Sequence, residues 1–214
     1  MQAEKAIKAE KETGRVEAFS DGVFAFAITV LVLDLKVPIP QDNVVGLFES
    51  LRSQWPMFLA FLISFGTILI MWINHHRLFT VIKHSSHWLL VFNGLLLLGV
   101  TVVPFSTEMV AAYYTASNFD KNVAAMVYSG VFVVISIFFN LLWRCVQSQK
   151  LLDDFADPTA ARRITRQYFF GPVTYLVALL LAIFSVPLSM ALNLLLAVFY
   201  ALPNAIVDSM LGIG

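Results

Sequence analysis

A polar group of side chains opens the first membrane-length apolar stretch of the chain, with the pattern Arg15-x-x-x-Phe19-Ser20-Asp21. A carboxylate at membrane depth is energetically costly and is usually kept for a function or for an assembly contact. The apolar run that follows has only 12 residues before Asp34. At 1.5 Å per residue this run covers about 18 Å, well short of the ~30 Å hydrocarbon core of a bilayer. We therefore expect a central helix that is surrounded by protein or lines an aqueous path.

A second polar group ends the next apolar stretch, with the pattern Trp72-x-x-His75-His76. The spacing of i, i+3 and i+4 places these three side chains on one face of a helix. Indole and imidazole N–H groups are donors and the Asp21 carboxylate is an acceptor, so we expect a network that joins Arg15 and Asp21 to these rings. The alternative is that the two histidines are interfacial residues at a helix end. Zinc binding is not expected, because the histidines are adjacent and no Cys or acidic ligand pattern accompanies them.

The first helix has one small apolar face. At about 100° per residue, the other members of this face fall within about 60° on either side of Phe26. The face consists of Gly22, Val23, Phe26, Thr29 at its edge, Val30 and Leu33. Asp21 falls about 140° away from Phe26. If the apolar face lines something, Asp21 therefore faces a neighbouring helix and acts structurally rather than on an ion.

The composition is that of a membrane protein, because 59% of the residues are hydrophobic and only 13% are charged. Stretches without Asp, Glu, Lys or Arg cover 53–74, 85–107, 122–143 and 167–207. The last has 41 residues, enough for two spans with a break at Ser185-Val186-Pro187. With the first helix this gives an all-α integral membrane protein of six transmembrane helices. Residues 1–18 are expected to form a cytoplasmic segment and residues 19–214 the transmembrane domain.

Lysine and arginine are unevenly distributed between the two sides of these spans. Of the 14 Lys and Arg residues, 11 lie in the N-terminal segment, in the connection 75–86 and in the segment 144–166. Cytoplasmic loops carry an excess of these residues, so both termini are expected in the cytoplasm. Trp55 and Trp143 are expected at the membrane interfaces. The N-terminal segment has no cleavable apolar region, so we expect no signal peptide.

Asparagines are among the polar residues within the expected spans. In an apolar helix, an asparagine can join a neighbouring helix through a hydrogen bond of about 1 kcal/mol or less. We expect this role for Asn93, Asn140, Asn193 and Asn204.

The two motifs together resemble those of the transmembrane-protein-175 family of endosomal/lysosomal potassium channels. The resemblance is carried by Arg15-x-x-x-Phe19-Ser20-Asp21 at the start of the first membrane helix and by Trp72-x-x-His75-His76. A single six-helix unit resembles the prokaryotic members, which assemble as tetramers. The resemblance implies a homotetrameric channel in a bacterial or archaeal cell membrane, with the first helix of each subunit lining a central pore that conducts K⁺ passively. The partners it implies are K⁺ ions, further copies of the chain and the lipid bilayer, with no nucleic acid, no cofactor and no metal beyond transient K⁺.

Side chains of the first helix narrow the pore in this family. Carried onto this chain, the resemblance implies that Phe26, Thr29, Val30 and Leu33 form the constriction that sets selectivity, without a filter of backbone carbonyls. Asp34 is a candidate for attracting cations to the outer mouth, and the alternative is an ordinary helix-end carboxylate. Relatives usually have Ile or Leu at the position of Phe26, so four phenylalanines would form a bulkier and flatter ring here.

Two other functional classes remain open. A secondary transporter would show repeated halves with Gly or Pro breaks at matching positions, and no paired halves are found. A membrane-embedded enzyme would need converging nucleophile, base or metal ligands at one depth. Neither the Gly-x-Ser-x-Gly nor the His-Glu-x-x-His pattern occurs. We therefore expect a channel and not an enzyme, with a secondary transporter as the alternative.

Overall fold

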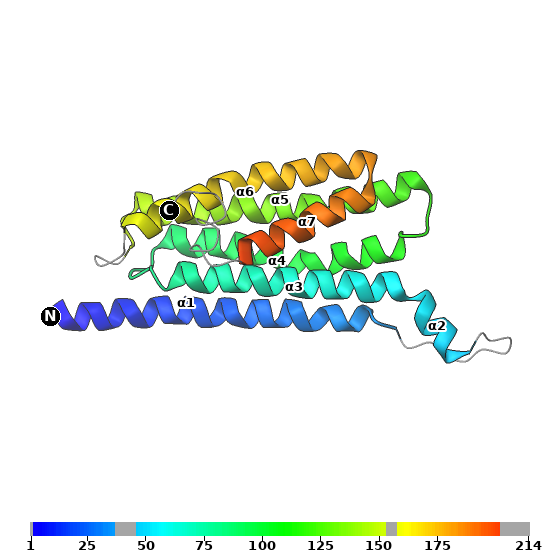
Figure 1. Ribbon diagram of the computed structural model, residues 1–214. Coiled ribbons are helices and arrows are strands. Elements are labelled where there is room, and N and C mark those ends of the chain that lie inside the picture. Colours follow the sequence, from blue (N-terminus) through cyan, green and yellow to red (C-terminus); the bar gives the residue numbers. More distant parts are fainter. Residues whose placement is uncertain (1, 37–45, 153–157, 202–214) are drawn as a thin grey trace.

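The computed structural model describes residues 2–36, 46–152 and 158–201. Within these ranges every regular element is a helix (Figure 1). The elements are α1 (Gln2–Val30), the short 3₁₀ helix η1 (Leu31–Asp34), α2 (Leu47–Ser53), α3 (Trp55–Phe79), α4 (His87–Ala112), α5 (Asn118–Ser148), α6 (Pro158–Phe184) and α7 (Val186–Ala201).

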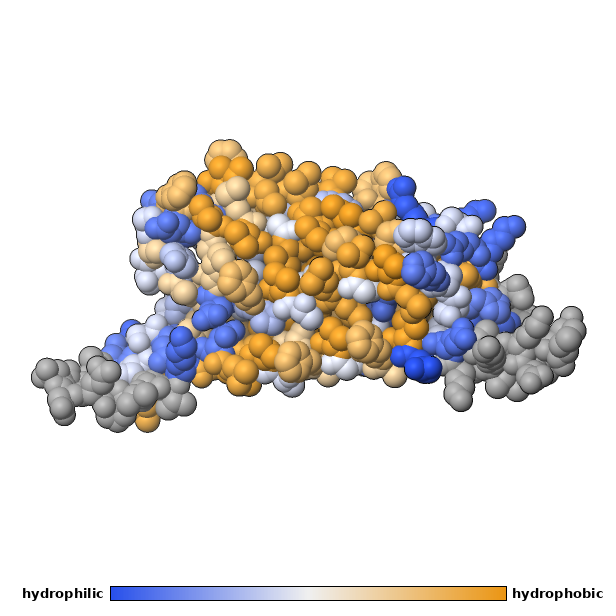
Figure 2. Space-filling model, turned by 180° about the vertical axis from the view of Figure 1, so that it is seen from behind, coloured by the Kyte–Doolittle hydropathy of each residue, from blue (hydrophilic) through white to orange (hydrophobic). Residues whose placement is uncertain are grey.

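Five of these helices are long and apolar enough to cross a membrane. α7, with 16 residues, is apolar but shorter, and the remainder of the sixth expected span lies outside the described residues. Figure 2 shows a belt of apolar side chains across the middle of the face in view and polar side chains at both ends of it. Such a belt is stable where lipid covers it, and the backbone within the belt is helical. The chain is therefore an all-α integral membrane protein.

Several helices begin where the sequence supplies a capping side chain. The Ser86 hydroxyl accepts a hydrogen bond of 3.2 Å from the Leu89 N–H at the start of α4. Ser117 accepts one of 3.2 Å from the Asp120 N–H at the start of α5. Pro56 lies in the first turn of α3, where a residue without an N–H removes no hydrogen bond. These residues set the boundaries between the spans.

The helices are arranged with α1 at one edge of the bundle. α1 packs against α3 and α4, whereas α5, α6 and α7 lie on the other side of these two helices (Figure 1). α1 buries the side of its surface that carries Phe24, Ala27 and, at the start of η1, Leu31. The opposite side of α1 is left uncovered by the rest of the described chain.

The N-terminal half of α1 is fastened to the connection between α3 and α4. The Thr13 hydroxyl donates to the Lys83 carbonyl at 3.3 Å, and the Ser85 hydroxyl donates to Glu12 at 3.1 Å. The Lys83 N–H in turn donates to the Leu151 carbonyl after α5, at 2.9 Å. α1 runs through this contact as one uninterrupted helix, so the expected boundary between 1–18 and 19–214 falls inside it.

Trp143 is a correction to the sequence-based expectation. Its side chain is only 1% exposed, and its indole N–H donates to the Thr165 hydroxyl at 2.8 Å. It therefore joins α5 to α6 inside the protein, and its assignment to a membrane interface was wrong. Trp55, at 48% exposure, lies on the surface at the start of α3.

The asparagines within the spans do join helices. Asn140 donates to the Tyr168 carbonyl at 2.8 Å and so links α5 to α6. Asn193 on α7 donates to the Ser129 hydroxyl on α5 at 2.9 Å. These bonds confirm the expected role for both residues, and that of Asn93 is described below. Asn204 lies outside the described residues.

α4 and α5 approach closely at Gly99. A Cβ added at Gly99 would lie 2.7 Å from Cγ1 of Ile135, a buried β-branched side chain with a stiff χ1 angle. We expect Gly99→Ala to lower the stability of the purified protein by about 1–3 kcal/mol, the usual cost of overpacking, measured as its thermal unfolding midpoint. Gly94→Ala on the same helix is the control, because a Cβ there has no neighbour within 4 Å. Equal midpoints for the two variants would contradict the prediction.

Candidate functional site

One face of α1 is exposed over most of its length. Phe26 is 66% exposed and Leu33 is 73% exposed. Thr29 lies between them on the same exposed face, and its hydroxyl donates to the Phe26 carbonyl at 2.8 Å. Val30 is partly buried at the edge of this face. We call the exposed side chains of Phe26, Thr29 and Leu33, together with Val32, the α1 stripe.

Val32 joins the stripe because the helix tightens at its end. A 3₁₀ helix has about 3.0 residues per turn instead of 3.6, so side chains change direction over η1. Val32 is 51% exposed as a result, while Leu31 is 1% exposed and packs into the core. Counting at 100° per residue did not place Val32 on this face, because it assumed α-helical geometry throughout.

Asp34 lies at the end of η1 and is partly buried. Together with Thr107 and Glu108 of α4 it lines a small cavity between η1, α3 and α4. Its Oδ2 atom is enclosed and has no hydrogen-bond partner among the described residues. The Asp34 carboxylate is thus turned toward α4 rather than along the α1 stripe.

Arg15 and Phe19 lie on the exposed side of α1, near its N-terminal half. Phe19 is 68% exposed, and Arg15 is exposed as well. Arg15 makes no hydrogen bond or ion pair with any residue that the structure describes. The structure therefore does not bring Arg15 or Phe19 into the network expected around Asp21.

The opposite side of α1 is tied to α3 by two polar contacts. The Trp72 indole N–H donates to Asp21 Oδ1 at 2.8 Å. One turn earlier on α1, Glu17 Oε1 lies 2.8 Å from His76 Nδ1. The Trp72 and His76 rings stack at a centroid distance of 5.8 Å. Asp21 thus contacts a neighbouring helix, on the side of α1 away from the stripe, as the helical wheel indicated.

A second, fully buried set of bonds joins α1, α4 and α3. The Ser20 hydroxyl donates to the Val16 carbonyl at 2.8 Å, so its oxygen accepts from Asn93 Nδ2 at 2.9 Å. The Asn93 Oδ1 atom is then oriented toward His75 Nε2, also at 2.9 Å. Because this oxygen is an acceptor, His75 must carry a hydrogen on Nε2. Ser20 and His75 are 0% exposed and Asn93 is 3% exposed.

The His75 ring is held between aromatic side chains. It stacks on Phe79 at a centroid distance of 4.4 Å and lies 5.3 Å from the Phe24 ring. Its Nδ1 atom has no hydrogen-bond partner among the described residues. Among the residues that the structure describes, no group of three or more His, Cys, Asp and Glu side chains is placed to hold a metal ion. His75 is a packing and hydrogen-bonding residue between three helices.

The sequence analysis did not identify Glu17 as a member of this network, nor the particular partners of Asn93. Glu17 could have been found, because Glu17 and Asp21 are spaced i, i+4 on α1 and so are Trp72 and His76 on α3. Two such pairs can align between antiparallel helices. The particular partners of Asn93 had no signal in the sequence, since they depend on how α4 is placed against α1 and α3.

Comparison with known proteins assigns this arrangement to a family. The family model described as endosomal/lysosomal potassium channel TMEM175 matches residues 15–104. A potassium channel of Chamaesiphon minutus is 49% identical over 195 residues, which cover 90% of this chain and 95% of that protein. A potassium channel of Streptomyces collinus is 42% identical over 190 residues, covering 88% of this chain and 91% of that protein.

A solved structure supports the same assignment. The crystal structure of a lysosomal potassium-selective channel TMEM175 homolog from Chamaesiphon minutus matches with a TM-score of 0.79 at 47% sequence identity. The match covers 89% of this chain and 97% of that chain. The similarity therefore extends over nearly the whole of both proteins, well beyond the two motifs. The chain belongs to the TMEM175 family, whose members are ion channels and not enzymes.

Proposed function

We propose that this protein is a potassium-permeable channel in which α1 of four identical subunits lines a central pore. The observation that carries the proposal is the α1 stripe, in which Phe26 is 66% exposed and Leu33 is 73% exposed. Either lipid or further copies of the same helix around an axis can cover these apolar side chains, and the short apolar run between Asp21 and Asp34 favours further copies. The potassium channels of Chamaesiphon minutus and Streptomyces collinus support K⁺ as the conducted ion.

The proposed pore is narrowed by side chains rather than by carbonyl oxygens. Rings of Phe26 and Leu33 would block current when narrow, because a thin apolar passage holds no continuous column of water. Thr29 and Val30 lie between these two levels along α1. K⁺ would be preferred over Na⁺ because less free energy is needed to strip water from the larger ion. This preference is expected to be modest, since apolar rings and one hydroxyl replace little of the hydration shell.

The proposed orientation places both termini in the cytoplasm of a bacterial or archaeal cell. It follows from the distribution of Lys and Arg and from six spans, with α7 counted as the last. Asp34 then lies near the outer mouth, where its charge would raise the local concentration of cations even from a position beside α4. Gly22 lies on the exposed side of α1, with no atom within 4 Å of a Cβ added there, and would let the helices splay on opening.

Replacement of Asp21 by asparagine tests the structural role of this residue. We expect Asp21→Asn to weaken the packing of α1 against α3 within each subunit, by about 1 kcal/mol, and with it the assembly of the tetramer, because a neutral acceptor bonds the Trp72 N–H less strongly than a carboxylate does. The fraction of tetramer is measured by size-exclusion chromatography, with single-channel current as the second readout. Glu49→Gln on the exposed helix α2 is the control. Normal oligomers that have lost conductance would instead put Asp21 in the ion path.

The proposed function is tested by reconstitution of the purified protein into a planar bilayer. A channel passes K⁺ down its gradient in discrete unitary steps, with a reversal potential that follows the K⁺ gradient. Saturating flux that requires a second, coupled ion would instead identify a secondary transporter. Absence of any K⁺ current from protein of normal oligomeric state would refute the proposal.

A further inference from the structure

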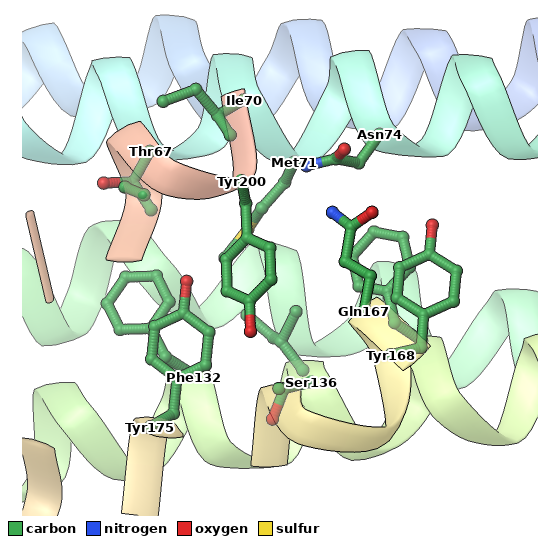
Figure 3. Close-up of a pocket in the computed structure, with 14 residues that line it drawn as sticks. Thr67, Ile70, Met71, Asn74, Phe132, Ser136, Gln167, Tyr168, Tyr175 and Tyr200 are labelled. Carbon is green, nitrogen blue, oxygen red and sulfur yellow. The ribbon is translucent and has the colours of Figure 1, made fainter. Parts of the chain in front are cut away.

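A cavity on the side of the bundle far from α1 has no role in the proposed pore. It lies between α3, α5, α6 and α7 and measures about 500 Å³ including its open mouth (Figure 3). Small-molecule sites in proteins are mostly apolar and carry a few polar groups. The apolar wall of this cavity is formed by Ile70, Met71, Phe132, Ile135 and Phe139.

Polar groups without partners gather at this cavity. The side-chain amides of Asn74 on α3 and Gln167 on α6 point toward one another across it, next to Tyr168 (Figure 3). Within the described chain, no hydrogen-bond partner is found for the side-chain amides of Asn74 and Gln167. The same is true of the hydroxyls of Tyr168 and Tyr175. Tyr175 is only 7% exposed. These polar groups line the open cavity, so they can donate to a ligand that carries acceptor oxygens.

A positive charge lies beside the same opening. Arg77 is spaced i, i+3 from Asn74 and follows it by one turn of α3. The Arg77 guanidinium acts electrostatically on Tyr168, which lines the cavity. Arg77 is exposed and makes no ion pair with any described residue. The acidic side chains that the structure describes at this end of the molecule are Glu12, Glu17 and Asp21 of α1. Each is hydrogen-bonded to a residue of α3 or of the connection after α3.

We propose that this cavity binds one anionic phospholipid, with its phosphate at Arg77 and an acyl chain along the apolar wall. A guanidinium can form two parallel hydrogen bonds to a phosphate. The Asn74 and Gln167 amides donate to the remaining phosphate or ester oxygens. A lipid is favoured over a free phosphate, because only a lipid would also cover the apolar wall. Assignment to the cytoplasmic leaflet rests on the proposed orientation, and α5, α6 and α7 face the bilayer if α1 faces the pore axis (Figure 1).

Native mass spectrometry of the purified full chain in detergent tests the site. The protein is titrated separately with phosphatidylglycerol and phosphatidylcholine, and bound lipids are counted per chain. We expect one tightly held phosphatidylglycerol per chain, and Arg77→Gln should weaken its binding about tenfold, as for the loss of one charged hydrogen-bonded pair. Arg144→Gln is the matched control. Arg144 is an exposed arginine of α5 at the same end of the molecule as Arg77, and it lies about 130° from the cavity-lining face of α5. The Arg144→Gln variant should therefore bind the lipid normally.

Several outcomes would overturn the proposal. One is an equal affinity of the wild type for phosphatidylglycerol and phosphatidylcholine. Another is an equal loss of phosphatidylglycerol binding in Arg77→Gln and Arg144→Gln, which would indicate diffuse charge attraction. If Arg77→Gln fails to fold, as judged by size-exclusion chromatography, Gln167→Leu takes its place and should also weaken phosphatidylglycerol binding. Potassium flux is recorded separately in liposomes. Normal flux without lipid preference refutes only the lipid site, and intact lipid preference without flux refutes only the channel function.

Discussion

Phe26→Ala is expected to raise single-channel conductance severalfold and to move the reversal potential under opposed K⁺ and Na⁺ gradients toward zero. Phe26 is 66% exposed on α1, and in the proposed tetramer four copies of its ring meet on the pore axis. Truncation to alanine widens this level of the pore, so that water can fill it and ions keep more of their hydration shell. Both permeating ions then pass at similar cost, and discrimination between them falls.

Phe169→Ala is the matched control for this experiment. Phe169 is similarly exposed, at 55%, but lies on α6, on the side of the bundle far from α1. Its truncation should leave conductance and reversal potential unchanged. If Phe26→Ala behaved like this control, Phe26 would be removed from the constriction, and the pore would have to be narrowed by other members of the α1 stripe.

Asn93→Leu is expected to destabilise the folded protein by about 1–3 kcal/mol, the cost of leaving buried polar groups without partners. The substitution breaks the 2.9 Å bonds to both His75 and Ser20. His75 is 0% exposed, and its other ring nitrogen already lacks a partner in the described chain, so the whole imidazole would be unsatisfied. Thermal unfolding of the detergent-purified protein, followed by loss of the oligomer peak, measures the effect.

Two comparisons separate this network from a simple loss of packing. Asn140→Leu breaks only the bond to the Tyr168 carbonyl and should cost less than Asn93→Leu. The double variant His75→Phe with Asn93→Leu should recover part of the loss, because replacement of both partners by apolar groups leaves no orphaned ring. Phe24 and Phe79 already surround the site. A double variant that is as unstable as the sum of the two single variants would show that the bonds are not coupled.

The sequence predicted the helical spans and the contact between α1 and α3 because both depend on local patterns. The charge-free stretches mark most of α3, α4 and α5, because a bilayer excludes charge from its core, and each helix extends up to five residues beyond its stretch. The helical wheel separated Asp21 from Phe26, because the angle between two residues of one helix is fixed by its geometry. The expected face differs from the exposed one at two residues. Val32 is exposed where the helix changes to η1, and Val23 packs against the core.

What could not be predicted depends on the placement of distant helices. Asn93 and Ser20 are separated by 73 positions, and their bond requires a particular rotation of α4 against α1. Trp143 was assigned to the interface from its position near a helix end, yet the rotation of α5 turns it onto α6. The cavity proposed to bind a lipid is likewise formed by four helices, and no local pattern in the sequence predicts it. In each case one-dimensional spacing says which residues share a face, but not what that face meets.

The uninterrupted helix that carries the stripe is anchored at several levels along its length. α1 has 29 residues and spans about 43 Å at 1.5 Å per residue. Glu12 and Thr13 bind the connection after α3, and Asp21 binds Trp72 further along the helix. Beyond Asp21, the side chains of Phe24, Ala27 and Leu31 are packed into the core. A movement that changes the diameter of the proposed pore at Phe26 therefore carries α3 and α4 with it.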